Sequence, residues 1–215
     1  MTNKRIVTAL FLLFFGISSG FAQQRWSAGP RVGLNLTDLI GGSLDGKLLP
    51  GVAAGGFIMY SDINHFGVSL DVLYSQKGAR YDLPFGSQNI TFKQRINYLE
   101  VPIALRYFLN RSGNFRPNLF VGPAFGLRLG AKVSNDANDN TTDVTNQYRK
   151  GDFGVMGGFQ LNFRVGEAQR LHIDARYTYG LTNIVASPTA ATGNDLRNST
   201  IALTVGYGIG LGRNY

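Results

Sequence analysis

Cysteine is absent from the 215 residues, which excludes disulfides, thiolate metal sites and lipid attachment through an amino-terminal cysteine. After residue 22 no long segment shows the helical spacing of apolar residues. Charged residues make up only 16%, and although the formal net charge is +8, the basic residues are scattered. Nucleic acid is therefore not an expected partner. A chain of this length needs only one domain, and these absences favour a β-rich one.

The amino terminus has the features of a secretory signal peptide. Lys4 and Arg5 precede an apolar run from Ile6 to Ile17, which small residues and Ala22 follow. We expect cleavage after Ala22, so that residues 1–22 are removed and residues 23–215 form the mature domain. A membrane anchor is disfavoured because a spanning helix needs roughly 20 apolar residues.

Alternation of apolar and polar residues recurs along the mature chain and predicts eight strands. In the clearest one, Phe66, Val68, Leu70 and Val72 share one face. The predicted strands cover residues 27–36, 51–61, 66–75, 98–107, 119–129, 153–165, 171–181 and 201–211.

The connections alternate in length. Long polar connections are predicted near residues 37–50, 78–92, 132–149 and 184–197, and short ones near 62–65, 109–116 and 166–169. Bacterial outer-membrane barrels have short periplasmic turns and long outer loops. The pattern predicts an eight-stranded antiparallel up-and-down transmembrane β-barrel with both termini in the periplasm.

A soluble barrel also alternates, with its apolar face inward, so the composition of the second face has to decide. That face carries glycine and charges of both signs, which suit a narrow lumen. The five mature lysines all lie in or beside the predicted long connections: Lys47, Lys77, Lys93, Lys132 and Lys150. The apolar face is therefore predicted to meet lipid, where a charge at the midplane costs about 2–4 kcal/mol.

Aromatic residues on the outward face fall near strand ends, as in two interfacial girdles. Phe66, Tyr107 and Phe163 lie toward the short turns, and Tyr74, Phe153 and Tyr179 toward the long loops. The final residue, Tyr215, is in phase with Tyr207 and Ile209. Such an aromatic end is typical of strands inserted by the barrel assembly machinery, which is an expected partner during insertion.

Two stretches resemble the PorT-like outer-membrane barrels of Bacteroidetes. They are Y-L-E-V-P-I-A-L-R-Y, residues 98–107, and R-Y-T-Y-G-L-T-N-I, residues 176–184. The Gly122-Pro123 step and the start of the sixth strand at Asp152 also match. The resemblance implies the barrel fold over the mature chain. The named member of that group assists protein export by the type IX secretion pathway, so a secretion-system protein is a possible partner.

The inward face carries the candidate site residues, namely Asp71, Glu100, Arg106, Arg128, Asp152, Arg164, Asp174 and Arg176. We predict that they form a buried network of ion pairs and hydrogen bonds that fills the lumen. The alternative is a charged constriction of a narrow pore. Pro102 lies in the fourth strand, where it cannot donate a ladder hydrogen bond, and we predict a bulge or a missing bond there.

Enzymatic small barrels exist, among them lipid A deacylases, but an acyl hydrolase needs a base aligned with a nucleophile. The two histidines do not meet this need, because His65 falls at a turn and His172 points into the lumen. The acidic loop from Ser134 to Asp143 lacks the spacing of a calcium-binding EF-hand. The alternate glycines from Gly206 onward fit lumen packing rather than a phosphate loop.

The sequence thus predicts a non-enzymatic protein of the bacterial outer membrane, without cofactor or metal, of structural, adhesive or narrow-channel type. Outer-membrane lipid and lipopolysaccharide are its expected surroundings. The alternative is an accessory of a type IX-like secretion pathway that acts through a protein partner.

Overall fold

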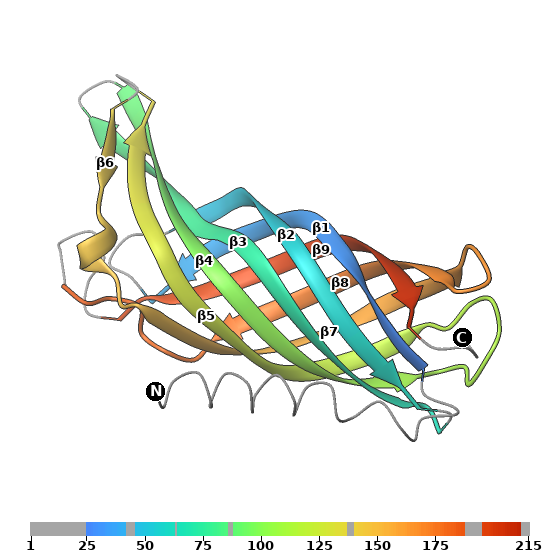
Figure 1. The fold of residues 1–215 in the computed structure, drawn as a ribbon. Helices are drawn as coiled ribbons and strands as arrows, with labels where there is room; N and C mark the ends of the chain where they lie inside the picture. Colours follow the sequence, from blue (N-terminus) through green and yellow to red (C-terminus); the bar gives the residue numbers. More distant parts are fainter. Residues whose placement is uncertain are drawn as a thin grey trace, which may run out of the picture.

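The computed structural model describes residues 25–41, 46–62, 64–85, 88–136, 140–187 and 195–211. Its strands form one antiparallel sheet (Figure 1). They are β1 (Arg25–Ile40), β2 (Lys47–Ser61), β3 (Phe66–Phe85), β4 (Gln88–Phe108), β5 (Asn118–Asn135), β6 (Thr141–Asp143), β7 (Gly151–Arg164), β8 (Gln169–Gly180) and β9 (Arg197–Gly210). One 3₁₀ turn, η1 (Thr145–Gln147), follows β6. Within these ranges no helix is long and apolar enough to cross a membrane.

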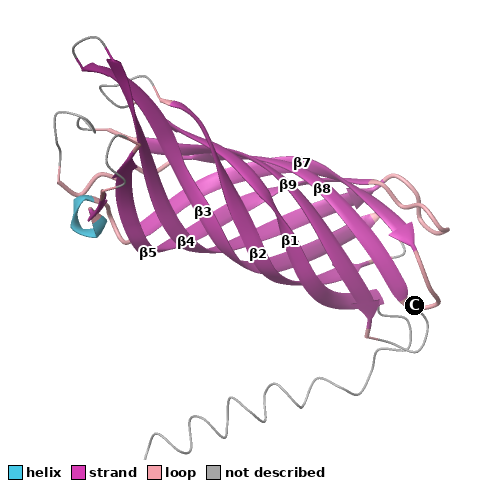
Figure 2. Cartoon of the chain, turned by 90° about the horizontal axis from the view of Figure 1, so that it is seen from above, coloured by secondary structure: helices cyan, strands magenta, loops and turns pink. Residues whose placement is uncertain are grey.

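Eight of the strands close into a barrel, seen from a second direction in Figure 2. Each pairs with its neighbour along the chain, β5 pairs with β7, and β1 pairs with β9 from Ser27–Gly210 to Ile40–Arg197. This closure leaves none of the eight as an edge strand. The ninth, β6, is a short addition that pairs with β5 at Lys132–Asp143 to Ser134–Thr141. The predicted eight-stranded barrel is confirmed.

The two ends of the barrel differ. We call the end with the β2–β3, β4–β5 and β7–β8 connections the turn end; β1 begins and β9 ends there. The opposite end, with the β1–β2, β3–β4, β5–β7 and β8–β9 connections, is the loop end. The predicted signal peptide and Tyr215 lie outside the described residues and stay predictions.

The outer face of the barrel is apolar. On β9, Ile201, Leu203 and Val205 are exposed while Ala202 and Thr204 are buried. Leu34 on β1 is 62% exposed, a large fraction for leucine in a folded protein. Exposed apolar side chains recur on the other strands of the ring, which is the outward face predicted for contact with lipid.

The strands extend further toward the loop end than the sequence suggested. The predicted connection at residues 78–92 is wrong, because β3 continues to Phe85 and β4 begins at Gln88. The one at 37–50 is also largely strand, since β1 reaches Ile40 and β2 begins at Lys47. The third, at 132–149, contains the end of β5, β6 and η1.

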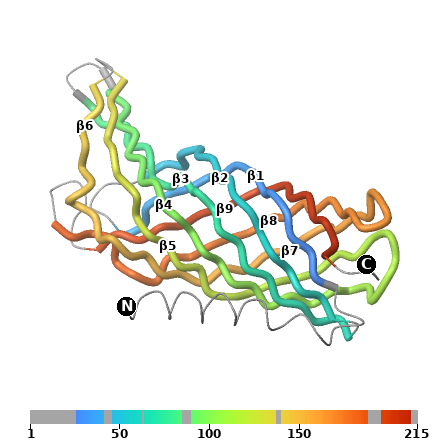
Figure 3. Tube along the Cα trace, viewed as in Figure 1, coloured from blue at the N-terminus to red at the C-terminus, as the bar shows by residue number. Residues whose placement is uncertain are grey.

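These extensions form a projection that we call the blade, made of residues 76–85, 88–97, 130–135 and 141–143. Figures 1 and 3 show it extending beyond the rest of the barrel at the loop end. In the blade the apolar residues lie on the inner face of the sheet, whereas in the barrel below it they lie mainly on the outer face. Up to Tyr74 the apolar residues of β3 face outward except Leu73, whereas beyond it Ala79 and Tyr81 are buried and Arg80 lies on the outer face. A bulge at Leu129 produces the same change on β5, because Gly130 pairs with Asn97 but Arg128 with Tyr98.

Pro102 interrupts the ladder without shifting its register. The β3–β4 pairs end at Leu70–Ile103 and resume at Leu73–Glu100 in the same register. Of the two predicted consequences of Pro102, a bulge or a missing bond, the bulge is absent and the local loss of pairing is found, as expected for a residue that has no N–H. The register shift of the β4–β5 ladder lies instead between Asn97 and Tyr98, opposite the bulge at Leu129.

Candidate functional site in the barrel lumen

The middle of the lumen holds an ion-pair network from three strands. Arg31 of β1 donates through Nη1 to Asp71 Oδ2 of β3 at 3.1 Å and to Asp174 Oδ2 of β8. Arg176, two residues after Asp174, donates through Nη2 to Asp71 Oδ2 at 2.9 Å. All four side chains are buried. They meet because each lies at an inward position of its strand, where period-two alternation directs it to the barrel axis.

Arg106 of β4 extends this network across the barrel. Its Nε donates to Ser69 Oγ at 2.8 Å and its Nη1 to Asn118 Oδ1 at 2.9 Å. Asn118 donates to Gln160 Oε1 at 2.8 Å, and Gln160 in turn donates to Asp174 Oδ1 at 2.6 Å. These hydrogen bonds therefore connect Arg106 to Asp174, one of the two carboxylates of the network.

The network contains three guanidinium groups and two carboxylates, so its positive charge is in excess. Aromatic rings lie under the cations: the Arg31 guanidinium is 4.8 Å from the Phe57 ring centre, and that of Arg106 is 4.6 Å from the Phe120 ring centre. Attraction to a ring face offsets part of the cost of burying the unmatched charge. The hydrogen bonds offset a further part of this cost, while Arg31 Nε and Nη2, Asp71 Oδ1 and Arg176 Nε have no hydrogen-bond partner among the described residues.

A second polar layer lies nearer the loop end. Lys77 Nζ donates to Glu100 Oε1 at 2.8 Å and lies 5.5 Å from the ring centre of Tyr98. Asn198 donates through Nδ2 to the Tyr98 hydroxyl at 3.2 Å and to Asp152 Oδ2 at 2.8 Å. This layer therefore connects β3, β4, β7 and β9.

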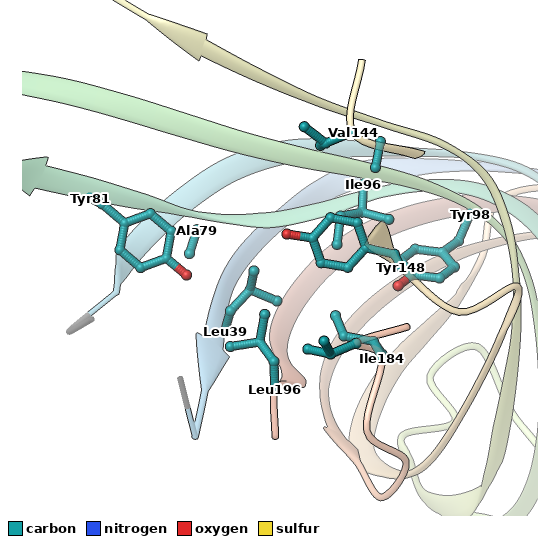
Figure 4. Packing of buried hydrophobic residues seen from close by; sticks show 11 residues of the cluster. Leu39, Ala79, Tyr81, Ile96, Tyr98, Val144, Tyr148, Ile184 and Leu196 are labelled. Carbon is teal, nitrogen blue, oxygen red and sulfur yellow. The ribbon is translucent and has the colours of Figure 1, made fainter. Parts of the chain in front are cut away.

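An apolar cluster, here the cap, closes the loop end of the lumen (Figure 4). Strand residues and connecting residues both contribute, and Tyr148, Ile184 and Leu196 reach it from outside the strands. The cap consists of Leu39, Ala79, Tyr81, Ile96, Tyr98, Ala131, Val144, Tyr148, Ile184, Val185 and Leu196, all buried. Polar connections were predicted at this end of the barrel, so the cap was not predicted.

The predicted site residues separate into three groups. Asp71, Glu100, Arg106, Asp152, Asp174 and Arg176 are all buried in the lumen. Arg128 is half-buried and donates to the Thr145 carbonyl at the loop end. Arg164 was placed wrongly: it is exposed at the last position of β7, where the strand leaves the lumen.

Arg31 and Lys77 are lumen residues that the sequence analysis missed. Arg31 alternates with Val32, but glycine and alanine dilute the pattern of this strand. Lys77 lies beside the connection predicted at residues 78–92 and outside the strand predicted at 66–75, although it is 4% exposed and ion-paired. In both cases the sequence offered one indication of a lumen residue, namely a single basic residue at a position that alternation places on the inner face.

The histidines serve packing. The His172 ring is buried 5.1 Å from the Phe57 ring, and a side chain at Gly208 would lie 3.1 Å from it. Among the described residues its ring nitrogens have no hydrogen-bond partner. At the turn end, His65 stacks on Tyr107, and its Nδ1 lies 2.5 Å from the Phe108 carbonyl oxygen.

The acidic side chains near the loop end order the backbone. Asp136 Oδ1 accepts from the Thr91 N–H and Asp143 Oδ1 from the Thr145 N–H, both at 2.8 Å. In the part of the chain that the structure describes, no group of three or more histidine or acidic residues is placed to hold a metal ion.

Residues 21–186 match the family model described as outer membrane protein beta-barrel domain. The chain belongs to this family. No curated protein matches it in sequence. The family and its barrel fold place the protein in the bacterial outer membrane.

Several solved structures are similar to this chain at low sequence identity. A major outer membrane protein from Thermus thermophilus is 11% identical with a TM-score of 0.54, over 88% of this chain and 100% of that one. The attachment invasion locus protein Ail of Yersinia pestis is 16% identical with a TM-score of 0.44, over 86% and 99%. OprG of Pseudomonas aeruginosa is 14% identical with a TM-score of 0.43, over 86% and 97%. The resemblance to PorT-like barrels stays a prediction.

Proposed function

We propose that this protein is a non-enzymatic outer-membrane barrel of structural or adhesive type that acts through its loop end rather than through its lumen. The filled lumen is the observation that carries the proposal. Two polar layers cross it, and the Arg31, Asp71 and Asp174 side chains at its middle are each at most 2% exposed. A narrow channel, the alternative, needs polar groups that ions or solutes can reach.

The loop end supplies the surface on which such a barrel acts. The blade continues the hydrogen-bonded sheet past the apolar band and presents polar residues such as Arg80, Lys93 and Lys132 on its outer face. Rigid strands hold a binding surface more accurately than mobile loops do. We infer that the loop end faces the cell exterior and that the termini face the periplasm.

Orientation is tested with single cysteines, for which the chain offers a cysteine-free background. Asn146 in η1 is exposed at the loop end, and Asn114 is exposed in the β4–β5 turn. A membrane-impermeant maleimide should label Asn146→Cys on intact cells, and Asn114→Cys only after lysis. The reverse pattern would refute the orientation.

Planar-bilayer recording tests the closed lumen. The purified barrel should give no stepwise conductance. The double variant Tyr148→Ala with Leu196→Ala removes two cap side chains but leaves both polar layers, so it should be silent as well. Reproducible conductance of the wild-type barrel would overturn the proposal, and conductance of the variant alone would show that only the cap closes the lumen.

Lipid A analysis tests the absence of enzymatic activity. Mass spectra of lipid A from cells that overproduce the protein should match those from cells without it. A lost or added acyl chain would identify an acyl hydrolase or transferase and contradict the proposal.

A further inference from the structure

The outer face of the blade carries basic residues in directly paired positions. Arg95 of β4 is the cross-strand partner of Lys132 of β5, and Lys93 of β4 is the partner of Arg80 of β3. Directly opposed residues of antiparallel strands lie on the same face with their Cβ atoms about 5 Å apart. Like charges in such positions repel and destabilise the sheet.

Three other cations of the loop end have carboxylate partners. Lys47 and Arg197 form ion pairs at 2.8 Å with Asp82 and at 2.9 Å with Asp195, and Arg80 lies 3.8 Å from Asp82. Across the described ranges, by contrast, Lys93, Arg95 and Lys132 have no carboxylate within 4 Å. Asp143, the cross-strand partner of Lys132 in the β5–β6 ladder, offsets part of their repulsion, but it is not within ion-pair distance of any of the three cations.

The three cations line one open pocket of about 230 Å³. Its other lining residues offer amide and hydroxyl groups: Gln76, Asn97, Ser134 and Thr141. Arg95 donates through Nη1 to the Pro50 carbonyl oxygen of β2 at 3.2 Å, passing its cross-strand partner Gly78, which has no side chain. This bond uses one of the five guanidinium N–H groups and fixes the position of the others.

The pocket lies just above the apolar band. On β4 the last outward apolar residue is Leu99, and Arg95 lies four residues beyond it. At about 3.3 Å per residue and a strand tilt of about 40°, Arg95 stands roughly 10 Å above the hydrocarbon edge. Lipid headgroups occupy about the first 5–7 Å beyond that edge, and Arg and Lys side chains are long enough to reach back to them.

We propose that this pocket binds the phosphate group of a phosphorylated glycolipid in the outer leaflet, of the lipid A type. The acyl chains of such a lipid would lie against the apolar face of β4 and β5 below the pocket, where Leu99, Leu127 and Leu129 are exposed. Its phosphate would neutralise the paired cations. The proposal rests on the proposed orientation of the loop end, which the cysteine labelling measures separately.

Two double variants with the same change in net charge test the site. Lys93→Gln with Lys132→Gln removes two pocket lysines, whereas the control, Lys47→Gln with Lys150→Gln, removes two lysines outside the pocket. Heat-modifiable migration on a gel shows whether each variant folds. Binding of bisphosphorylated lipid A, dephosphorylated lipid A, phosphatidylglycerol and inorganic phosphate is measured on barrels in neutral-lipid nanodiscs.

We expect the pocket variant to bind bisphosphorylated lipid A roughly 10–30-fold more weakly than the wild type, from the attraction that each basic residue contributes near a lipid surface. The control should change binding by less than about threefold, because its lysines lie away from the lipid phosphate. The wild type should bind dephosphorylated lipid A as weakly as the pocket variant binds bisphosphorylated lipid A.

Three results would overturn the assignment. Equal weakening in both variants would mean that only net charge matters. Equal binding of phosphatidylglycerol would show a general anionic-lipid surface, and equally tight binding of inorganic phosphate would show a site that does not use the lipid. The planar-bilayer recording tests whether the lumen conducts, so neither of its outcomes changes the interpretation of the lipid-binding test.

Discussion

Replacing Asp174 by asparagine removes one of the two carboxylates that face three guanidinium groups in the middle of the lumen. Asp174 accepts from Arg31, and its Oδ2 lies 3.9 Å from nitrogens of both Arg106 and Arg176. After the change Asp71 alone would balance three buried cations. Removing one partner of a buried ion pair costs about 3–5 kcal/mol, because the remaining charge stays out of water. We expect the free energy of unfolding to fall by that amount.

Urea unfolding in detergent micelles measures the change through the fluorescence of Trp26, the single tryptophan. Asparagine retains an oxygen that can accept from Gln160, so loss of that bond is not the cause. Asp195→Asn is the control, since its ion pair with Arg197 is solvent-exposed and worth less than about 1 kcal/mol. A loss below about 1 kcal/mol for Asp174→Asn would refute the inference that the network is buried and essential to stability.

Three further outcomes are expected. Leu34→Arg puts a charge on the exposed apolar face of β1 and should lower the free energy of unfolding by about 2–4 kcal/mol, measured by urea titration of Trp26 fluorescence with the barrel in lipid bilayers instead of micelles. An unchanged value would place this face outside the hydrocarbon. Gly29→Ala should prevent closure of the barrel, since its Cβ would lie 1.8 Å from the Tyr207 carbonyl oxygen, and a retained heat-modifiable band would contradict this. Burial, with a smaller effect of Asp38, raises the pKa of Tyr81 to about 12. The stability that the neutral Tyr81 hydroxyl contributes should therefore be complete below pH 10 and be lost as the pH rises toward 12. In a pH titration followed by tyrosinate absorbance, the Tyr81→Phe variant should lack one tyrosine that ionises late.

The faces of the central strands were predictable because a strand alternates with a period of two and its surroundings differ on the two sides. On β4 the outward Leu105 and Tyr107 and the inward Glu100 and Arg106 follow directly from that pattern. The part of β3 after Tyr74 and the part of β4 before Leu99 could not be predicted from alternation. There the medium outside the sheet changes from lipid to water, the apolar residues move to the inner face, and the break in alternation resembles a loop.

The contacts within the lumen also required the structure. Alternation shows that Asp71 and Asp174 point inward, but it does not show that both bind Arg31, since the partners lie 40 and 143 residues apart in sequence. Strand stagger and tilt decide which inward positions share a level. The same geometry takes Arg164 out of the lumen, because an inward position at the last residue of a strand meets solvent.

The sequence by itself determined the number of strands, their faces and most residues of the lumen, because these depend on local periodicity. The tertiary structure alone decided that two polar layers and an apolar cap lie in the lumen, and that three cations gather on the outer face of the blade. Both features depend on which strands lie side by side and in what register. Barrel closure fixes that register through hydrogen bonds between residues far apart in the chain.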